Sequence, residues 1–151
     1  MKTKTIITDL TQEDLVNLLC TATYGSSWLD CSAPERSGII IDDTDCREDV
    51  WAKALLAGHK IKVYDYNAEG DTYGKLGRVI KEDGTAVYFV GLKEITDGLQ
   101  KCADGTFTES EEYGEWLAKC FSNFKEDNGH MDNPEAEALM QIILFGELIY
   151  G

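Results

Sequence analysis

One segment of the chain carries oxygen-bearing side chains at the spacing of a calcium-binding loop. From Asp65 to Asp71, carboxylate or amide side chains occupy alternate positions, and Gly70 stands sixth, where such loops turn sharply. The twelfth position should carry a glutamate that binds calcium through both oxygens, but it is Leu76. A strand rather than a helix is also expected to precede the segment. We therefore interpret it as a polar turn, and we predict no metal site and no cofactor.

A second group of carboxylates lies just before an expected helix, at Asp42, Asp43 and Asp45. The N-terminus of a helix carries a partial positive charge, so acidic residues there stabilise it without any ligand. Hard cations also favour oxygen clusters, but nothing in this spacing selects a metal. The alternatives left open are helix capping by solvated charge and the binding of a partner or a divalent cation.

The cysteines and histidines form no recognisable catalytic or zinc-binding set. Five cysteines are spread along the chain without a Cys-x-x-Cys pair, and there are only two histidines. We expect five reduced thiols, as in cytoplasmic proteins. Because no nucleophile and base occur at a telling spacing, the sequence favours a non-catalytic protein and names no catalytic residue.

The elements that must position these residues begin with a mixture of helices and strands. Residues 11–14 resemble a helix-capping box, and apolar residues follow at helical spacing up to Gly25. A second helix is expected after Asp45, ending at Gly58. Strands are predicted at residues 3–8, 38–41 and 60–66.

The clearest local pattern is a β-hairpin over residues 77–90. Two runs rich in strand-forming residues flank Asp83-Gly84, a pair that tolerates the positive φ angles of a tight turn. Three consecutive helices are predicted to follow. The middle one is expected to be capped by Thr108 and Glu111, with one apolar stripe formed by Tyr113, Trp116, Leu117, Cys120, Phe121 and Phe124.

The last helix is expected to begin at Asn133-Pro134, because proline suits the first helical turn. Residues 138–150 are apolar almost all round, which is typical of a buried helix. Glu147 is anomalous there, since a carboxylate opposes the helix dipole; it either faces solvent or pairs with a base. If its own chain covers only half of this helix, the rest is a homodimer surface.

Together these elements predict an α+β fold, with helices packed on one face of a small antiparallel sheet. The length of 151 residues, without repeats or linkers, predicts a single domain over residues 1–151. The N-terminus lacks the apolar stretch of about 7–15 residues of a signal peptide, and no apolar run reaches the ~20 residues of a membrane span. We therefore expect a cytoplasmic protein without membrane contact.

The chain is strongly acidic, because 28 Asp and Glu against 14 Lys and Arg give a net charge of −14. This charge disfavours direct binding to nucleic acid or an anionic membrane, since both attract positive charge. Residues 30–49 hold seven acids and two bases (−5), and residues 104–137 hold ten acids and two bases (−8). These two acidic segments carry −13 of the −14. They supply the candidate partner-binding residues, Asp42, Asp43, Asp45, Glu109, Glu111, Glu112 and Glu115.

The closing segment, Glu137 to Gly151 (EALMQIILFGELIYG), resembles the C-terminal signature of small uncharacterised proteins carried by phages and mobile elements of gut bacteria. Residues 10–15 and 23–25 are also similar to that group. The resemblance covers about a fifth of the chain. It implies a setting, a mobile element inside a bacterial cell, and it carries over no activity, ligand or catalytic residue.

These observations favour an acidic, non-catalytic protein-interaction or accessory protein whose partner is a basic protein. One alternative is an inhibitor that mimics nucleic acid and competes for a basic groove, if the two acidic segments meet in the fold. A second is a small enzyme that uses a carboxylate as general base or a cysteine as nucleophile. A cleft joining such groups with strongly shifted pKa values would support the enzyme.

Overall fold

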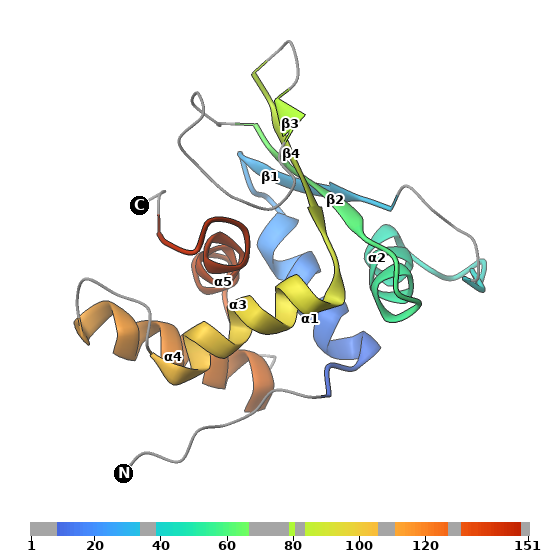
Figure 1. Ribbon diagram of the computed structural model, residues 1–151. Coiled ribbons are helices and arrows are strands. Elements are labelled where there is room, and N and C mark those ends of the chain that lie inside the picture. Colours follow the sequence, from blue (N-terminus) through green and yellow to red (C-terminus); the bar gives the residue numbers. More distant parts are fainter. Residues whose placement is uncertain are drawn as a thin grey trace.

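The computed structural model describes residues 9–33, 39–66, 79–80, 84–105, 111–126 and 131–148. Within these residues the chain forms an α+β fold with a four-stranded antiparallel sheet and five α-helices, the last three consecutive (Figure 1). The helices are α1 (Gln12–Thr23), α2 (Arg47–Leu56), α3 (Leu92–Asp104), α4 (Glu111–Glu126) and α5 (Asn133–Phe145). The strands are β1 (Leu29–Ser32), β2 (Ile61–Asp65), β3 (Val79–Ile80) and β4 (Ala86–Val90).

The sheet has the order β1-β2-β4-β3, so β1 and β3 are its edge strands. The predicted hairpin is confirmed, because β3 pairs with β4 in antiparallel register. Gly84 before β4 has a φ of 87°, the left-handed backbone that makes glycine the favoured residue there.

Helices cover one face of the sheet (Figure 1). Successive strand side chains point to opposite faces, so every second residue lies on the helix-covered side. These inward residues are buried: Leu29, Cys31, Ile61, Val63, Asp65, Ala86, Tyr88 and Val90. Below them, Phe145 at the end of α5 contacts the rings of Trp28 and Tyr88, at centroid distances of 6.2 and 5.7 Å. The sheet and α5 therefore share one core cluster.

Two helices begin at capping boxes. Before α1, the Asp14 amide donates to Thr11 Oγ1 and the Thr11 amide donates to the Asp14 carboxylate, each at 3.1 Å. Asp14 also accepts from Lys125 Nζ at 3.1 Å, which ties α1 to α4. Before α5, Asp132 and Glu135 make the same reciprocal pair.

Helix α5 is the central helix of the bundle and packs against α1, α3 and α4. Residues 138–144 are all buried, as predicted for this apolar segment. Gly98 of α3 allows the close approach of these two helices: a Cβ there would lie 2.5 Å from Ile143 Cγ1 and 2.7 Å from Ile143 Cα.

Several boundaries differ from those predicted. Helix α5 ends at Phe145, because Gly146 takes a left-handed conformation with a φ of 75°. Glu147 therefore lies beyond the helix and is exposed, so it does not oppose the helix dipole. Helix α2 is capped at Cys46 and Asp49 rather than at Asp45.

The second strand falls at a different place from the one predicted at residues 38–41. Residues 39–41 are not in a strand, whereas Leu29–Ser32 forms β1. The predicted strand at residues 3–8, the Thr108 cap and most of the calcium-like turn lie outside the described residues. None of the helices in the described ranges is long and apolar enough to cross a bilayer.

Candidate functional site

The exposed side of α4 holds the candidate site. Gly114, Leu117, Cys120 and Phe124 form the buried stripe of this helix. Four other residues near the start of this helix are exposed, and we call them the α4 face: Glu112, Tyr113, Glu115 and Trp116. Tyr113 is 57% exposed and Trp116 is 39% exposed. Residues three apart are neighbours on a helix surface, so the two rings and the two carboxylates form one patch.

The expectation that Tyr113 and Trp116 belong to the buried stripe is wrong. A stripe through Leu117 and Phe124 leaves Trp116 turned about 100° away from its neighbour Leu117, on an α-helix of 3.6 residues per turn. Tyr113 lies in the first turn of α4, beside Gly114, whose carbonyl oxygen faces the end of α3 at Gly105.

The nearest base along α4 to the carboxylates of the α4 face is Lys119, which is exposed and stands four residues after Glu115. Among the described residues, none of the ion pairs involves Glu112 or Glu115. Lys125 at the far end of the helix pairs with Asp14 of α1 instead. Two exposed carboxylates that make no ion pair within the described ranges therefore flank two exposed aromatic rings.

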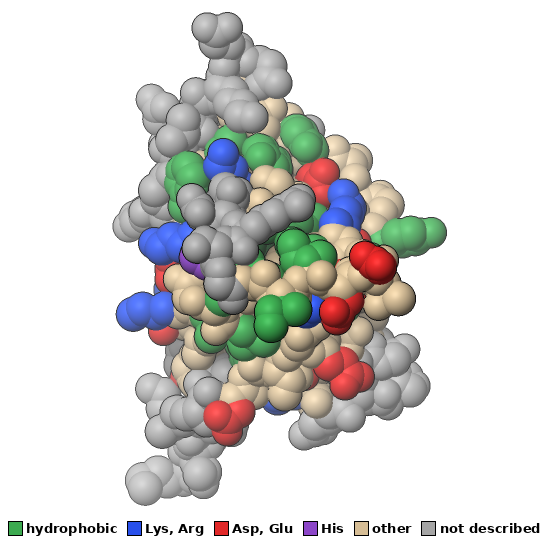
Figure 2. Space-filling view, turned by 90° about the vertical axis from the view of Figure 1, so that its right-hand side faces the viewer, with side chains coloured by type: hydrophobic (Ala, Val, Ile, Leu, Met, Phe, Trp, Pro, Cys, Tyr) green, Lys and Arg blue, Asp and Glu red, His purple; other side chains and the backbone are tan. Residues whose placement is uncertain are grey.

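Four of the seven acidic residues in the first acidic segment lie within 4 Å of Arg47 or Lys53. Arg47 pairs with Asp30 at 3.2 Å and with Glu48 at 3.3 Å. Lys53 pairs with Asp45 and lies 3.7 Å from Asp42. Figure 2, which views the molecule from the α2 side, shows acidic and basic side chains interspersed on this face.

Lys53 also organises the turn before α2. Its ammonium group donates to the carbonyl oxygen of Ile40 at 2.9 Å, and the Asp42 amide donates to the Asp45 carboxylate at 2.9 Å. The hydrogen bond from Lys53 lowers the pKa of Asp45, and the same bond raises the pKa of Lys53. The Asp45 side chain therefore has a structural role in this turn, while the side chains of Asp42 and Asp43 are exposed.

The two acidic segments do not form one surface in the described part of the chain. In Figure 1, the residues before α2 lie on the right and α4 lies at the lower left, with α1 and α3 between them. Of the predicted candidates, Glu112 and Glu115 form an exposed pair on α4, and Asp42 and Asp43 form another before α2, where Lys53 lies 3.7 Å from Asp42. Glu109 and the side chain of Glu111 lie outside the described residues.

None of the cysteines has the properties of an activated nucleophile. Burial raises the thiol pKa of four of them, to about 12 in the last: Cys20, Cys31, Cys102 and Cys120. The thiol of Cys46 donates to Asp49 at 3.1 Å, and this hydrogen bond raises its pKa. Because the thiolate is the reactive form, these shifts lower the reactivity of all five at neutral pH.

Metal ligands do not converge in the described ranges either, where no group of three or more His, Cys, Asp or Glu side chains is placed to hold an ion. Comparison of the chain with protein-family models, with curated proteins and with solved structures gives no match. Among the described residues, the α4 face is therefore the feature that best supports a function.

Proposed function

We propose that this chain is a non-catalytic binding protein that takes a basic segment of another protein on its α4 face. The observation that carries the proposal is the exposure of Tyr113 and Trp116 between two exposed carboxylates that make no ion pair among the described residues. Tryptophan and tyrosine are enriched among residues that dominate binding energy at protein interfaces. Their ring faces also attract lysine and arginine side chains.

Charge complementarity identifies the chemistry of the partner. A net charge of −14 repels nucleic acid and anionic surfaces and attracts a basic protein. Glu112 and Glu115 would set the association rate and orientation, since charges at the edge of an interface steer encounter. The aromatic pair would supply most of the affinity by burial against the partner. We place this protein in the cytoplasm of a bacterial cell, as an accessory protein of a mobile element.

A titration with a defined probe tests the proposal. The probe is a synthetic lysine- and arginine-rich helical peptide without tryptophan, and the readout is the quenching of tryptophan fluorescence by acrylamide. Trp28 and Trp51 are 5% and 3% exposed, so Trp116 is the tryptophan that the quencher reaches most readily. We expect the bound peptide to protect Trp116.

The matched variants separate the α4 face from general charge attraction. Because Y113A/W116A lacks the Trp116 reporter, its peptide binding is measured by isothermal titration calorimetry, as is that of the wild type and the control. The variant leaves every charge in place and should bind the peptide at least tenfold more weakly, which corresponds to about 1.4 kcal/mol. The control L56A removes an exposed apolar side chain from α2 and should bind as the wild type does. Equal binding by Y113A/W116A and L56A would show that the aromatic pair contributes nothing.

A further inference from the structure

The outer edge of β1 is an edge of the sheet, at which a further strand could be added. Edge strands present unpaired backbone groups that can template a strand from a second chain. Just before β1, the carbonyl of Trp28 accepts from the Tyr66 amide at 2.8 Å, so the backbone carbonyl of Trp28 points toward the neighbouring strand. Inward and outward backbone groups alternate in an antiparallel pair, so the amides of Leu29 and Cys31 point away from β2.

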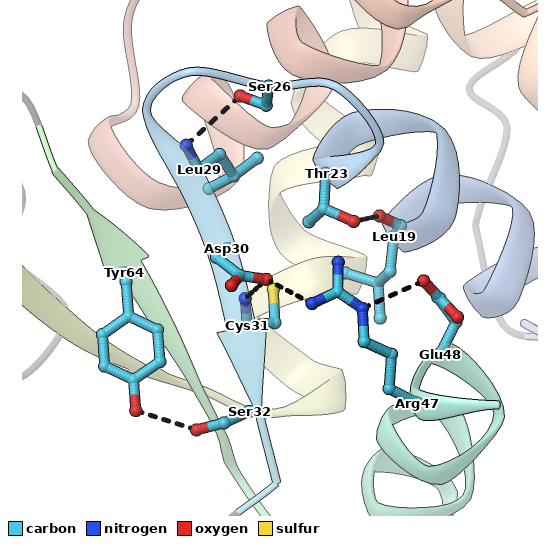
Figure 3. Close-up of polar contacts among 10 residues, drawn as sticks. All are labelled: Leu19, Thr23, Ser26, Leu29, Asp30, Cys31, Ser32, Arg47, Glu48 and Tyr64. Carbon is cyan, nitrogen blue, oxygen red and sulfur yellow. Dashed lines mark hydrogen bonds and ion pairs between the residues drawn. The ribbon is translucent and has the colours of Figure 1, made fainter.

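Both outward amides are occupied by side chains from the same segment (Figure 3). The Leu29 amide donates to Ser26 Oγ at 3.2 Å, and the Cys31 amide donates to Asp30 Oδ1 at 2.8 Å. Both outward amides of β1 are therefore already hydrogen-bonded and are not available to an approaching strand.

Arg47 holds the second of these caps in place. Its guanidinium group lies 3.2 Å from the same Oδ1 atom of Asp30. It is itself held by Glu48 at 3.3 Å and lies over the ring of Trp51, 5.0 Å from the centroid. These contacts fix a charged group from α2 beside the edge of β1 (Figure 3).

We propose that Ser26 and Asp30 close the edge of β1 against strand addition by a second copy of this chain, with Arg47 as the positioning residue for Asp30. A second copy is the matching occupant because an antiparallel β1–β1 pair is self-complementary: each copy presents Leu29 and Cys31 to the other. The net charge of −14 adds a general repulsion between copies. The side-chain caps add a block specific to this edge.

The experiment compares the association of the full chain and its variants by sedimentation velocity over a range of concentrations, at low and at raised salt. S26A/D30A removes both caps, and we expect its apparent dimer dissociation constant to be at least tenfold lower than that of the wild type. Raised salt should strengthen this association by screening the repulsion. D30N keeps a side-chain oxygen that can accept from the Cys31 amide, and it should remain close to the wild type.

Two further variants keep the proposal open to refutation if S26A/D30A unfolds. R47Q leaves β1 unchanged but removes the cation beside Asp30, so we expect association between that of the wild type and that of the double variant. D43A removes one exposed carboxylate far from β1 and should not associate. A folded S26A/D30A or R47Q that sediments as the wild type does, or a D43A that associates equally, would overturn the proposal.

Discussion

At the scale of the residue, Trp116 is the exposed tryptophan of the acidic α4 face. Its ring is 39% exposed and lies beside two carboxylates and one base, Lys119. Because the carboxylates outnumber the base, the electrostatic potential around this ring should be negative. On the α2 side, Arg47 and Lys53 pair with their acidic neighbours.

Ionic quenchers measure the potential around Trp116 directly. We expect caesium ions to quench the exposed tryptophan fluorescence more effectively than iodide, because Glu112 and Glu115 attract the cation and repel the anion. E112Q/E115Q should remove the difference at nearly constant shape, and W116F should remove the quenchable fraction. Equal quenching of the wild type by the two ions would contradict this picture of the α4 face.

Lys53 gives a second test at the residue scale. The folded-state pKa of Asp45 is lowered by its hydrogen bond from Lys53, so this carboxylate stabilises the fold above its unfolded-state pKa. That contribution is lost as the pH falls through the lowered folded-state value. We expect an NMR titration of the Asp45 side chain to show a midpoint below 3.8, the value for an unperturbed group.

The variant K53M supplies the control for that titration. Removal of the ammonium group should move the Asp45 midpoint upward toward its ordinary value, and the turn over residues 40–45 should lose protection from amide exchange. An unchanged midpoint in K53M would mean that Lys53 is not the cause of the shift.

The sequence identified the charged residues of the site but assigned its aromatic residues to the core. Exposed Glu112 and Glu115 could be inferred from composition, because carboxylates are rarely buried without a partner. The helical spacing of apolar residues predicts Tyr113 and Trp116 inside, because they stand on one stripe with Leu117 and Cys120. The usable signal was the position of Trp116 next to Leu117, since neighbouring residues on a helix face different directions.

At the scale of the element, the strongest local patterns predicted the strongest structures. The capping box at Thr11 and Asp14, the Asp-Gly hairpin and the apolar segment of α5 all formed where the sequence placed them. Strand β1 could not be found in this way, because Leu29–Ser32 is short and contains two polar residues. Its pairing with β2, more than 30 residues away, determines its conformation.

The contact between α3 and α5 depends on the absence of a side chain at Gly98. An alanine Cβ at this position would lie 2.7 Å from Ile143 Cα, so the two backbones must move apart. Alanine gains up to about 1 kcal/mol of helix propensity over glycine, but overpacking of a core costs about 1–3 kcal/mol and more against backbone. We expect G98A to lower the free energy of unfolding by about 2 kcal/mol, measured by urea denaturation.

An exposed position of the same helix provides the comparison. K101A lies on the solvent side of α3 and should change the free energy of unfolding by no more than about 0.5 kcal/mol. If G98A were as stable as K101A, the close approach of α3 and α5 would not be a requirement of the fold.

At the scale of the whole molecule, the described parts of the two acidic segments do not gather on one surface. The sequence shows two acidic segments of −5 and −8, which suggested one extended surface. The described parts of these segments lie on different sides of the molecule (Figure 1), and four of the seven acidic residues of the first lie within 4 Å of Arg47 or Lys53. Separation in space could not be read from the sequence, because it depends on how α4 packs against α1, α3 and α5.

Helix α5 also bears on assembly at this scale. The expectation of a homodimer rested on an uncovered apolar half of the C-terminal helix. Residues 138–144 are buried within a single chain, so α5 presents no such half in the described residues. The binding surface that we propose is therefore the α4 face and not α5.

The most direct test of that account is affinity capture from a bacterial lysate with two matched charge reversals. E112K/E115K and D42K/D43K each remove two negative charges and add two positive ones, so both change the net charge by +4, from −14 to −10. Only the location differs. We expect the wild type and D42K/D43K to retain the same basic protein, and E112K/E115K to lose it. Loss of that protein by both variants alike, or its retention by E112K/E115K, would contradict the assignment of binding to the α4 face.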